Sequence, residues 1–181
     1  MGIAFGLAVN FGVDQAAAWT AQDLVRGAMP LTAGRRQVGL HEPAVCWETD
    51  ADDVPYLLMS VLPIGIGRGL PVDRGHELVR LPAAALTELG HQLYRLLGRF
   101  TGYRAAQVGW DPFTLVDLAE LRRECVEGLQ AGTIPGLVLA ENILPEARGT
   151  VFKPFVPEFV WIPYAGERPS TLTTDGDNLV A

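Results

Sequence analysis

Hydrophobic residues alternate with small or polar ones at the start of the chain, over residues 3–13. The alternating positions are Ile3, Phe5, Leu7, Val9, Phe11 and Val13. A period of two places them on one face of an extended chain, so the pattern predicts a strand with one buried face. A helix over 15–26 follows, because Asp14 is a favoured N-terminal cap, the segment is rich in alanine and Gly27 suits a helix end. Trp19 is expected to anchor this helix to the core.

Short apolar runs between turn residues predict further strands. The runs 44–48 and 56–62 flank an acidic turn around Asp52, which favours an antiparallel hairpin. Shorter strands are predicted over 77–81, 103–108 and 136–140. The aromatic-rich segment 152–164 contains three prolines, so it favours a bent edge strand over a central one.

Two longer helices are predicted in the second half of the chain. Leucines recur at intervals of three and four over 83–100, which gives that helix one apolar face. A second helix, over 114–130, carries a row of acidic residues. The elements together predict one α+β domain over residues 1–166, a mainly antiparallel sheet with two or three helices packed on it. Residues 167–181 are polar and are expected to form a flexible tail.

Composition agrees with a packed, water-soluble domain. The chain has 181 residues, of which 49% are hydrophobic and 19% charged, and its formal net charge is −7. The negative charge works against binding to nucleic acid or to an anionic membrane and favours a basic partner. The N-terminus lacks the basic start of a signal peptide, and no apolar run reaches the roughly 18 residues of a membrane span, so we expect a cytoplasmic protein.

The acidic row on the second helix is the clearest candidate for a binding surface. Asp117, Glu120, Glu124 and Glu127 follow one another at spacings of three, four and three, which aligns them on one helical face. Such faces are often merely solvated, and the neighbouring arginines at 122 and 123 could neutralise them. Trp110 and Asp111 precede the row, and an aromatic anchor beside carboxylates suits a basic protein partner. The residues expected to bind a partner are Trp110, Asp111, Asp117, Glu120, Glu124 and Glu127.

The sequence contains no recognisable set of catalytic residues. Whether the chain is an enzyme stays open, and a non-enzymatic binding protein is favoured. Cys46 and Cys125 lack the spacing of a zinc site and are expected to be buried free thiols. We therefore assign no catalytic residue, metal or cofactor. One alternative is a small hydrolase or ligand-binding enzyme that uses His76, Glu77 and Cys46 beside the loop 63–75. A second alternative is a structural subunit that assembles through an apolar edge at 155–164.

One resemblance sharpens the binding hypothesis. A strand ending in VGWDP, an acidic helix, the strand GLVLAENIL and a closing strand with WIPYAGE occupy residues 76–166. This arrangement resembles the small α+β immunity proteins that are encoded beside bacterial polymorphic or secreted toxins. The resemblance implies a cytoplasmic, non-enzymatic protein that binds a cognate toxin and covers its active site. The six residues from Trp110 to Glu127 would then meet basic side chains of the toxin, while the oligomeric state stays open.

Overall fold

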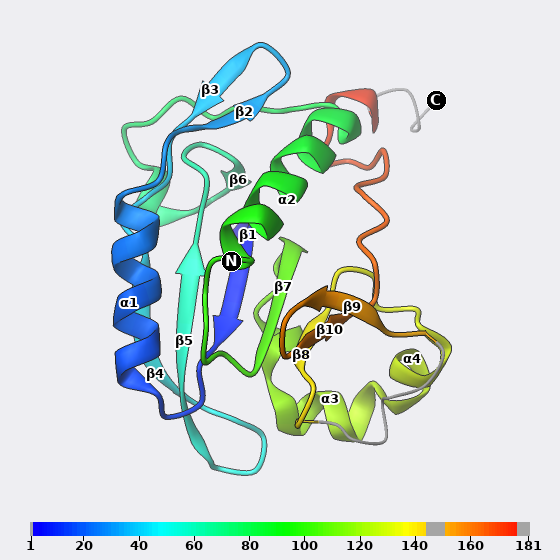
Figure 1. Cartoon of the computed structure of the whole chain (residues 1–181). Helices are drawn as coiled ribbons and strands as arrows, with labels where there is room; N and C mark the ends of the chain where they lie inside the picture. The colour runs from blue at the N-terminus through cyan, green and yellow to red at the C-terminus, as the bar shows by residue number, and fades with distance from the viewer. Residues whose placement is uncertain (1, 144–150, 177–181) are drawn as a thin grey trace.

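The alternating N-terminal segment forms strand β1 (Ile3–Asn10), which lies in the middle of the main sheet (Figure 1). The computed structural model describes residues 2–143 and 151–176. Strand β1 pairs antiparallel with β5 (Pro55–Val61) on one side and with β7 (Ala105–Trp110) on the other. The predicted N-terminal strand is confirmed, and it is the strand around which the sheet is built.

The described part of the chain contains one eight-stranded antiparallel sheet in the order β4-β5-β1-β7-β8-β10-β9, with β6 paired to one end of β1. The other strands of this sheet are β4 (Ala44–Thr49), β6 (Gly67–Arg68), β8 (Val138–Ala140), β9 (Lys153–Val156) and β10 (Phe159–Trp161). Strands β4 and β5 form the predicted hairpin. A separate ribbon consists of β2 (Leu31–Ala33) and β3 (Arg36–Val38). The predicted α+β class with a mainly antiparallel sheet is confirmed.

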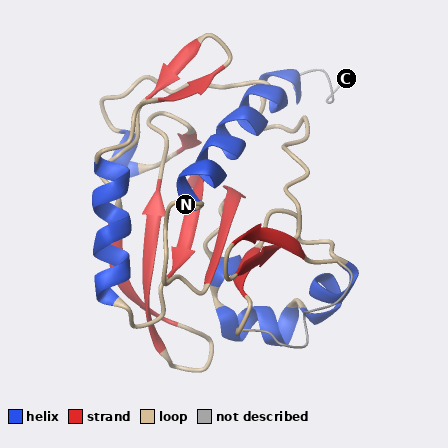
Figure 2. Cartoon of the chain, in the orientation of Figure 1, coloured by secondary structure: helices blue, strands red, loops and turns tan. Residues whose placement is uncertain are grey.

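Helices α1 (Gln15–Arg26) and α2 (Ala83–Leu97) cover one face of the sheet, and Figure 2 shows α2 crossing in front of the strands. The predicted caps of α1 are confirmed, because the Asp14 carboxylate accepts a hydrogen bond from the Ala17 amide at 3.0 Å and Gly27 follows the last turn. Both helices pack on the alternating apolar face of β1 in one cluster of buried side chains, among them Phe5, Leu7, Val9, Val25, Leu86, Leu89, Leu93 and Leu97. The odd positions of β1 therefore build the larger core.

The opposite face of the sheet carries three short helical elements, η2 (Thr114–Val116), α3 (Leu118–Glu124) and α4 (Val126–Ala131). Their buried side chains pack against Ala8 of β1 and Ala105 of β7 in a second cluster, which includes Val116, Leu118, Leu121, Leu129, Leu137 and Leu139. Small residues on this face of the central strands let the helical elements approach closely. The domain thus has helices on both faces of its sheet.

The continuous helix predicted over 114–130 is wrong. Asp117 has an extended backbone, and its carboxylate accepts hydrogen bonds from the Ala119 and Glu120 amides, so it starts a new helix. Cys125 then lies between the end of α3 and the start of α4. The acidic row is divided as a result, with Asp117 before α3, Glu120 and Glu124 on α3, and Glu127 on α4.

Three smaller predictions also differ from the structure. Residues 77–81 have irregular backbone, although the Val79 amide donates to the Gly65 carbonyl. Trp19 is 57% exposed, because Ala18, Ala21 and Val25 form the buried face of α1. Cys46 is exposed because it lies on β4, at an edge of the sheet, and Cys125 is half-buried.

Residues 167–176 run beside α2 and contact its N-terminal half (Figure 1). The Glu167 amide donates to the Thr87 hydroxyl at 2.8 Å, and the Ala83 amide donates to the Asp175 carboxylate at 3.1 Å. Thr173 is fully buried. The flexibility of the tail stays a prediction, and its last five residues lie outside the described ones.

Candidate functional site

The second half of β7 leaves room for a cavity at the side of the sheet. Strand β8 pairs only with Ala105 and Ala106, so no described strand pairs with Gln107–Trp110 on that side. The Tyr94 hydroxyl of α2 bridges the gap beside them, donating to the Gly136 carbonyl at 2.6 Å and accepting from the Val108 amide at 3.1 Å. Beyond this bridge lies a cavity of about 550 Å³ between β7, the start of α4 and residues 164–167.

We call this space the β7 cavity and describe it by its wall residues. The residues that matter for its chemistry are Gln107, Trp110, Glu124, Cys125, Glu127, Tyr164 and Glu167. Three of them are carboxylates, and none of the described residues in the wall is an arginine, a lysine or a histidine. The volume lies within the roughly 300–1,000 Å³ that is usual for small-molecule sites. The cavity therefore suits a positively charged group.

The two arginines on α3 do not neutralise the acidic row. Arg122 donates to the Ile143 carbonyl at 3.3 Å. Arg123 donates to the Ala51 carbonyl at 2.9 Å and forms an ion pair with Asp52. No ion pair within the described residues involves Glu124 or Glu127, both of which are exposed. The contacts of Arg122 and Arg123 therefore do not support the alternative in which these arginines neutralise the acidic row.

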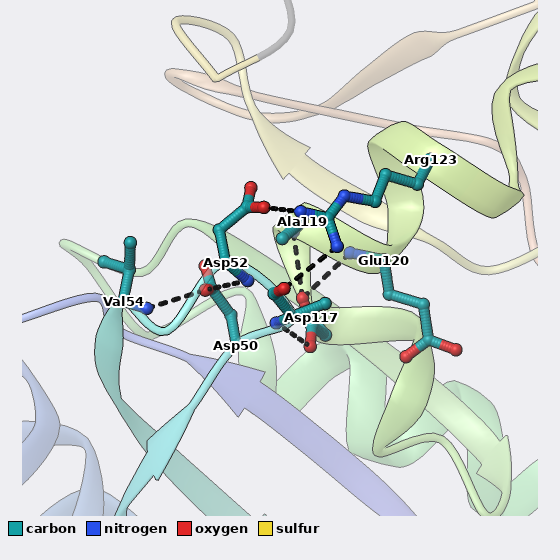
Figure 3. Close-up of polar contacts among 8 residues, drawn as sticks. Asp50, Asp52, Val54, Asp117, Ala119, Glu120 and Arg123 are labelled. Atoms are coloured by element: carbon teal, nitrogen blue, oxygen red, sulfur yellow. Dashed lines mark hydrogen bonds and ion pairs between the residues drawn. The ribbon is translucent and has the colours of Figure 1, made fainter.

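Asp117 holds the hairpin turn against the start of α3 (Figure 3). One carboxylate oxygen caps α3, and the other accepts from the Ala51 amide at 3.2 Å. Within the turn, Asp50 accepts from the Asp52 and Val54 amides, each at 2.9 Å. Figure 3 shows the Glu120 carboxylate pointing away from this cluster. Asp117 is thus occupied with backbone donors, whereas Glu120 remains available to a partner.

Asp111 and Trp110 have different surroundings although they are adjacent. Asp111 extends the β1–β7 pairing, since its amide donates to the Ala4 carbonyl at 2.8 Å and its carboxylate accepts from the Ala4 amide at 2.9 Å. Trp110 is half-buried, packs edge-on against Phe5 with ring centres 5.5 Å apart, and forms part of the cavity wall. Of the six predicted residues, the structure brings Trp110, Glu124 and Glu127 together at the cavity. That any of the six binds a partner stays a prediction.

The inner wall contains two residues that sequence reasoning did not select, Tyr164 and Glu167. The Tyr164 hydroxyl donates to a Glu167 carboxylate oxygen at 2.7 Å. Burial raises the pKa of Glu167, and the hydrogen bond from Tyr164 opposes part of that rise. The pair packs on α2 at Gly90, where a Cβ would lie 2.6 Å from the Tyr164 hydroxyl oxygen. Both residues belong to the WIPYAGE segment at residues 161–167.

Gln107 supplies a third inner residue. It is only 7% exposed, and its amide nitrogen donates to the Pro135 carbonyl at a long 3.4 Å. Its side-chain oxygen is buried and accepts no hydrogen bond from any described residue. A polar residue inside the apolar strand AAQVGW was the available sequence signal for this position.

The residues proposed for a hydrolase do not assemble into a catalytic set. The Cys46 thiol contacts Glu48 on its own strand and the Leu58 carbonyl, and burial followed by Glu48 raises its pKa, which lowers its nucleophilicity. Glu77 pairs with Arg36 at 3.5 Å. His76 lies edge-on to His41, with ring centres 5.4 Å apart. Within the described residues, no hydrogen bond joins Cys46, His76 and Glu77 to one another.

His41 is instead held by a buried aspartate beside the loop 63–75. Its Nε2 lies 2.7 Å from Oδ1 of Asp73, and the same oxygen accepts from the Gly65 amide at 2.8 Å. Asp73 is the last residue of η1 (Pro71–Asp73) and is 5% exposed. No hydroxyl or thiol of the described residues hydrogen-bonds to His41. The His41–Asp73 pair joins the loop to the segment before β4.

The aromatic residues at 155–164 largely contact the fold itself. Phe155 and Trp161 pack against Tyr94 of α2, with ring centres 6.1 and 5.4 Å away. Phe159 stacks on Tyr103 at 3.9 Å. These contacts account for the hydrophobicity of the segment through intramolecular packing.

No group of three histidine, cysteine or acidic residues is placed to hold a metal ion in residues 2–143 and 151–176. None of the described helices is long and apolar enough to cross a bilayer. Comparison with protein-family models, with curated proteins and with solved structures finds no match to the chain.

Proposed function

We propose that the chain is a non-enzymatic binding protein that neutralises a basic partner protein, as an immunity protein does for a bacterial toxin domain. The partner binds across α3, α4 and the mouth of the β7 cavity. Binding there places the body of the domain over the partner's functional surface and blocks access to it.

One observation carries the proposal. Glu124 and Glu127 lie at a cavity mouth beside Trp110, and no described cation forms an ion pair with either carboxylate. Exposed carboxylates of this kind speed the encounter with a positively charged surface, and an aromatic ring beside them provides contact area once water is displaced. The net charge of −7 adds a long-range attraction of the same sign.

The first test asks whether the chain protects a cell. The chain is expressed with an affinity tag in a bacterium that carries its neighbouring genes, and a basic protein that co-purifies in stoichiometric amount is identified. That protein is then expressed alone and with the chain. We expect growth inhibition by the partner alone and restored growth when the chain is present. A co-purifying partner whose activity is unchanged by the chain would contradict neutralisation.

The second test locates the surface. Reversing both cavity carboxylates, in Glu124→Lys/Glu127→Lys, is expected to lower the association rate by about tenfold or more at low salt and to weaken its salt dependence. The control Glu141→Lys/Glu158→Lys makes the same change in net charge at two exposed residues outside the cavity wall. Equal effects of the two double variants would mean that net charge alone matters, and would remove the cavity from the interface.

A further inference from the structure

Another cavity, of about 490 Å³, lies between the C-terminal half of α2 and the strands β9 and β10. We call it the α2 cavity. The wall residues that matter for its chemistry are His91, Arg95, Arg99, Phe155 and Trp161. None of the described residues in this wall is acidic. In a chain with a net charge of −7, a wall with two arginines and no carboxylate is a local reversal of charge.

The two arginines of this wall have no carboxylate partner. No ion pair within the described residues involves Arg95 or Arg99, and both are exposed. A spacing of four residues places His91, Arg95 and Arg99 along one side of α2 and the turn that follows it. Lys153 is the cross-strand partner of Trp161, so its side chain lies on the same face of the β9–β10 pair. Three or four basic groups therefore gather here without a counter-charge.

Aromatic rings form the other part of the wall. Phe155 and Trp161 pack against each other with ring centres 5.0 Å apart, and both are only half-buried. Cations near the C-terminal end of a helix are favoured by the helix dipole, which accounts for the arginines without any ligand. The dipole does not account for two partly exposed rings beside them. Rings and cations together are what a flat anionic ligand needs.

The two kinds of wall residue favour two parts of one ligand. A guanidinium group matches the oxygens of a carboxylate or a phosphate, and two such groups on one helix can share one anion. A tryptophan or phenylalanine ring contacts a planar ring through offset or edge-on packing. The volume lies within the roughly 300–1,000 Å³ that is usual for small-molecule sites. The negative net charge works against a long polyanion, so a small ligand is favoured over a nucleic acid strand.

We propose that the α2 cavity binds a small molecule in which an anionic group is attached to a planar aromatic ring. The ring lies against Trp161 and Phe155, and the anionic group is bound by Arg95 and Arg99. A nucleoside monophosphate and an aromatic carboxylate share this chemistry. The inference does not depend on the proposed partner protein, because it concerns another cavity and is measured on the chain alone.

The test follows the indole N–H resonances of the isotope-labelled chain by NMR. The chain has four tryptophans, and Trp161→Phe identifies the resonance of the one in the α2 cavity. We expect AMP or indoleacetate to shift the Trp161 resonance in a saturable way, and the probe that does so identifies the source of the ligand. Adenosine and indoleacetamide, which lack the anionic group, are expected to bind at least about tenfold more weakly than their charged counterparts.

Three results would overturn the proposal. The first is no saturable shift of the Trp161 resonance with either charged probe at about 20 mM, a concentration that detects even weak binding. The second is equal affinity for a charged probe and its neutral counterpart. The third is a saturable shift confined to the resonances of the other three tryptophans, which lie outside this wall.

Variants then assign the wall residues by calorimetry with the probe that binds. Arg95→Gln/Arg99→Gln is expected to weaken binding about tenfold or more, because it removes the charged donors. The control Arg35→Gln/Arg74→Gln makes the same change in net charge at two exposed residues outside the wall and is expected to leave binding unchanged. Equal affinities of the two double variants would refute the role of the arginines.

Trp161→Leu tests the aromatic part of the wall and is expected to weaken binding about fivefold or more. Trp161 also packs on Tyr94, so circular dichroism and the unfolding transition must show that this variant is folded. Unchanged affinity in a folded Trp161→Leu variant would refute the place of the ring. The double arginine variant changes only exposed side chains, so it tests the proposal even if the leucine variant unfolds.

Discussion

Replacing Asp117 by alanine is expected to destabilise the domain, because one side chain joins two separate elements. Its carboxylate accepts three backbone hydrogen bonds, from Ala119 at 2.9 Å, Glu120 at 3.0 Å and Ala51 at 3.2 Å. Loss of a helix cap of this kind costs about 1 kcal/mol. The bond to the Ala51 amide adds about 0.5–1 kcal/mol, at the low end of the usual range because water can replace it on an exposed turn.

The expected loss for Asp117→Ala is therefore about 1.5–2 kcal/mol in the free energy of unfolding. Asp117→Asn is the matched control, since asparagine caps helices about as well as aspartate, and it should lose less than about 1 kcal/mol. Urea unfolding followed by circular dichroism measures both, and the midpoint should shift while the slope stays the same. A loss below about 0.5 kcal/mol in the alanine variant would refute the view that this residue anchors the hairpin turn to α3.

Three further predictions concern buried polar groups. The Tyr103 hydroxyl is buried and has no partner within the described residues, so Tyr103→Phe should stabilise the domain by about 1 kcal/mol, and a loss of stability in thermal unfolding would contradict this. Because burial raises the pKa of Glu167 in the folded state, the native protein holds this proton to higher pH than the unfolded chain, so its contribution to stability falls as pH rises between the two pKa values. Glu167→Gln should therefore gain in relative stability over that window and keep the gain at pH 7, and unfolding titrations from pH 4 to pH 8 would expose an absent or reversed trend. Asp73→Ala should cost about 1–3 kcal/mol, because it leaves the Gly65 amide and His41 without their shared acceptor, and proteolysis within the loop 63–75 should accelerate.

Local patterns in the sequence predicted the first two elements of the fold well. The strand beginning at Ile3 and the helix 15–26 are confirmed, because period-two alternation, an aspartate cap and a closing glycine act within a few residues of one another. The helix over 114–130 was predicted wrongly for a related reason. The spacing of its carboxylates suits a helix, but Asp117 is also a strong capping residue, and in the structure its capping role prevails.

Features that depend on distant parts of the chain could not be predicted in the same way. An apolar run such as that around Cys46 does not reveal whether its strand lies at the edge of the sheet, so the thiol was expected to be buried and is exposed. The β7 cavity forms because β8 pairs with only two residues of β7. The extent of that pairing depends on how two distant segments align. Gln107 and Glu167 both line this cavity although sixty residues separate them, since 167 − 107 = 60. No local pattern connects two such positions.

Hydrogen exchange of the chain, free and bound to its co-purified partner, tests the central claim most directly. We predict that binding slows exchange at residues 107–110, 124–135 and 164–167, which surround the β7 cavity. Protection confined to other surfaces, such as the exposed edge strand β4, would contradict the account.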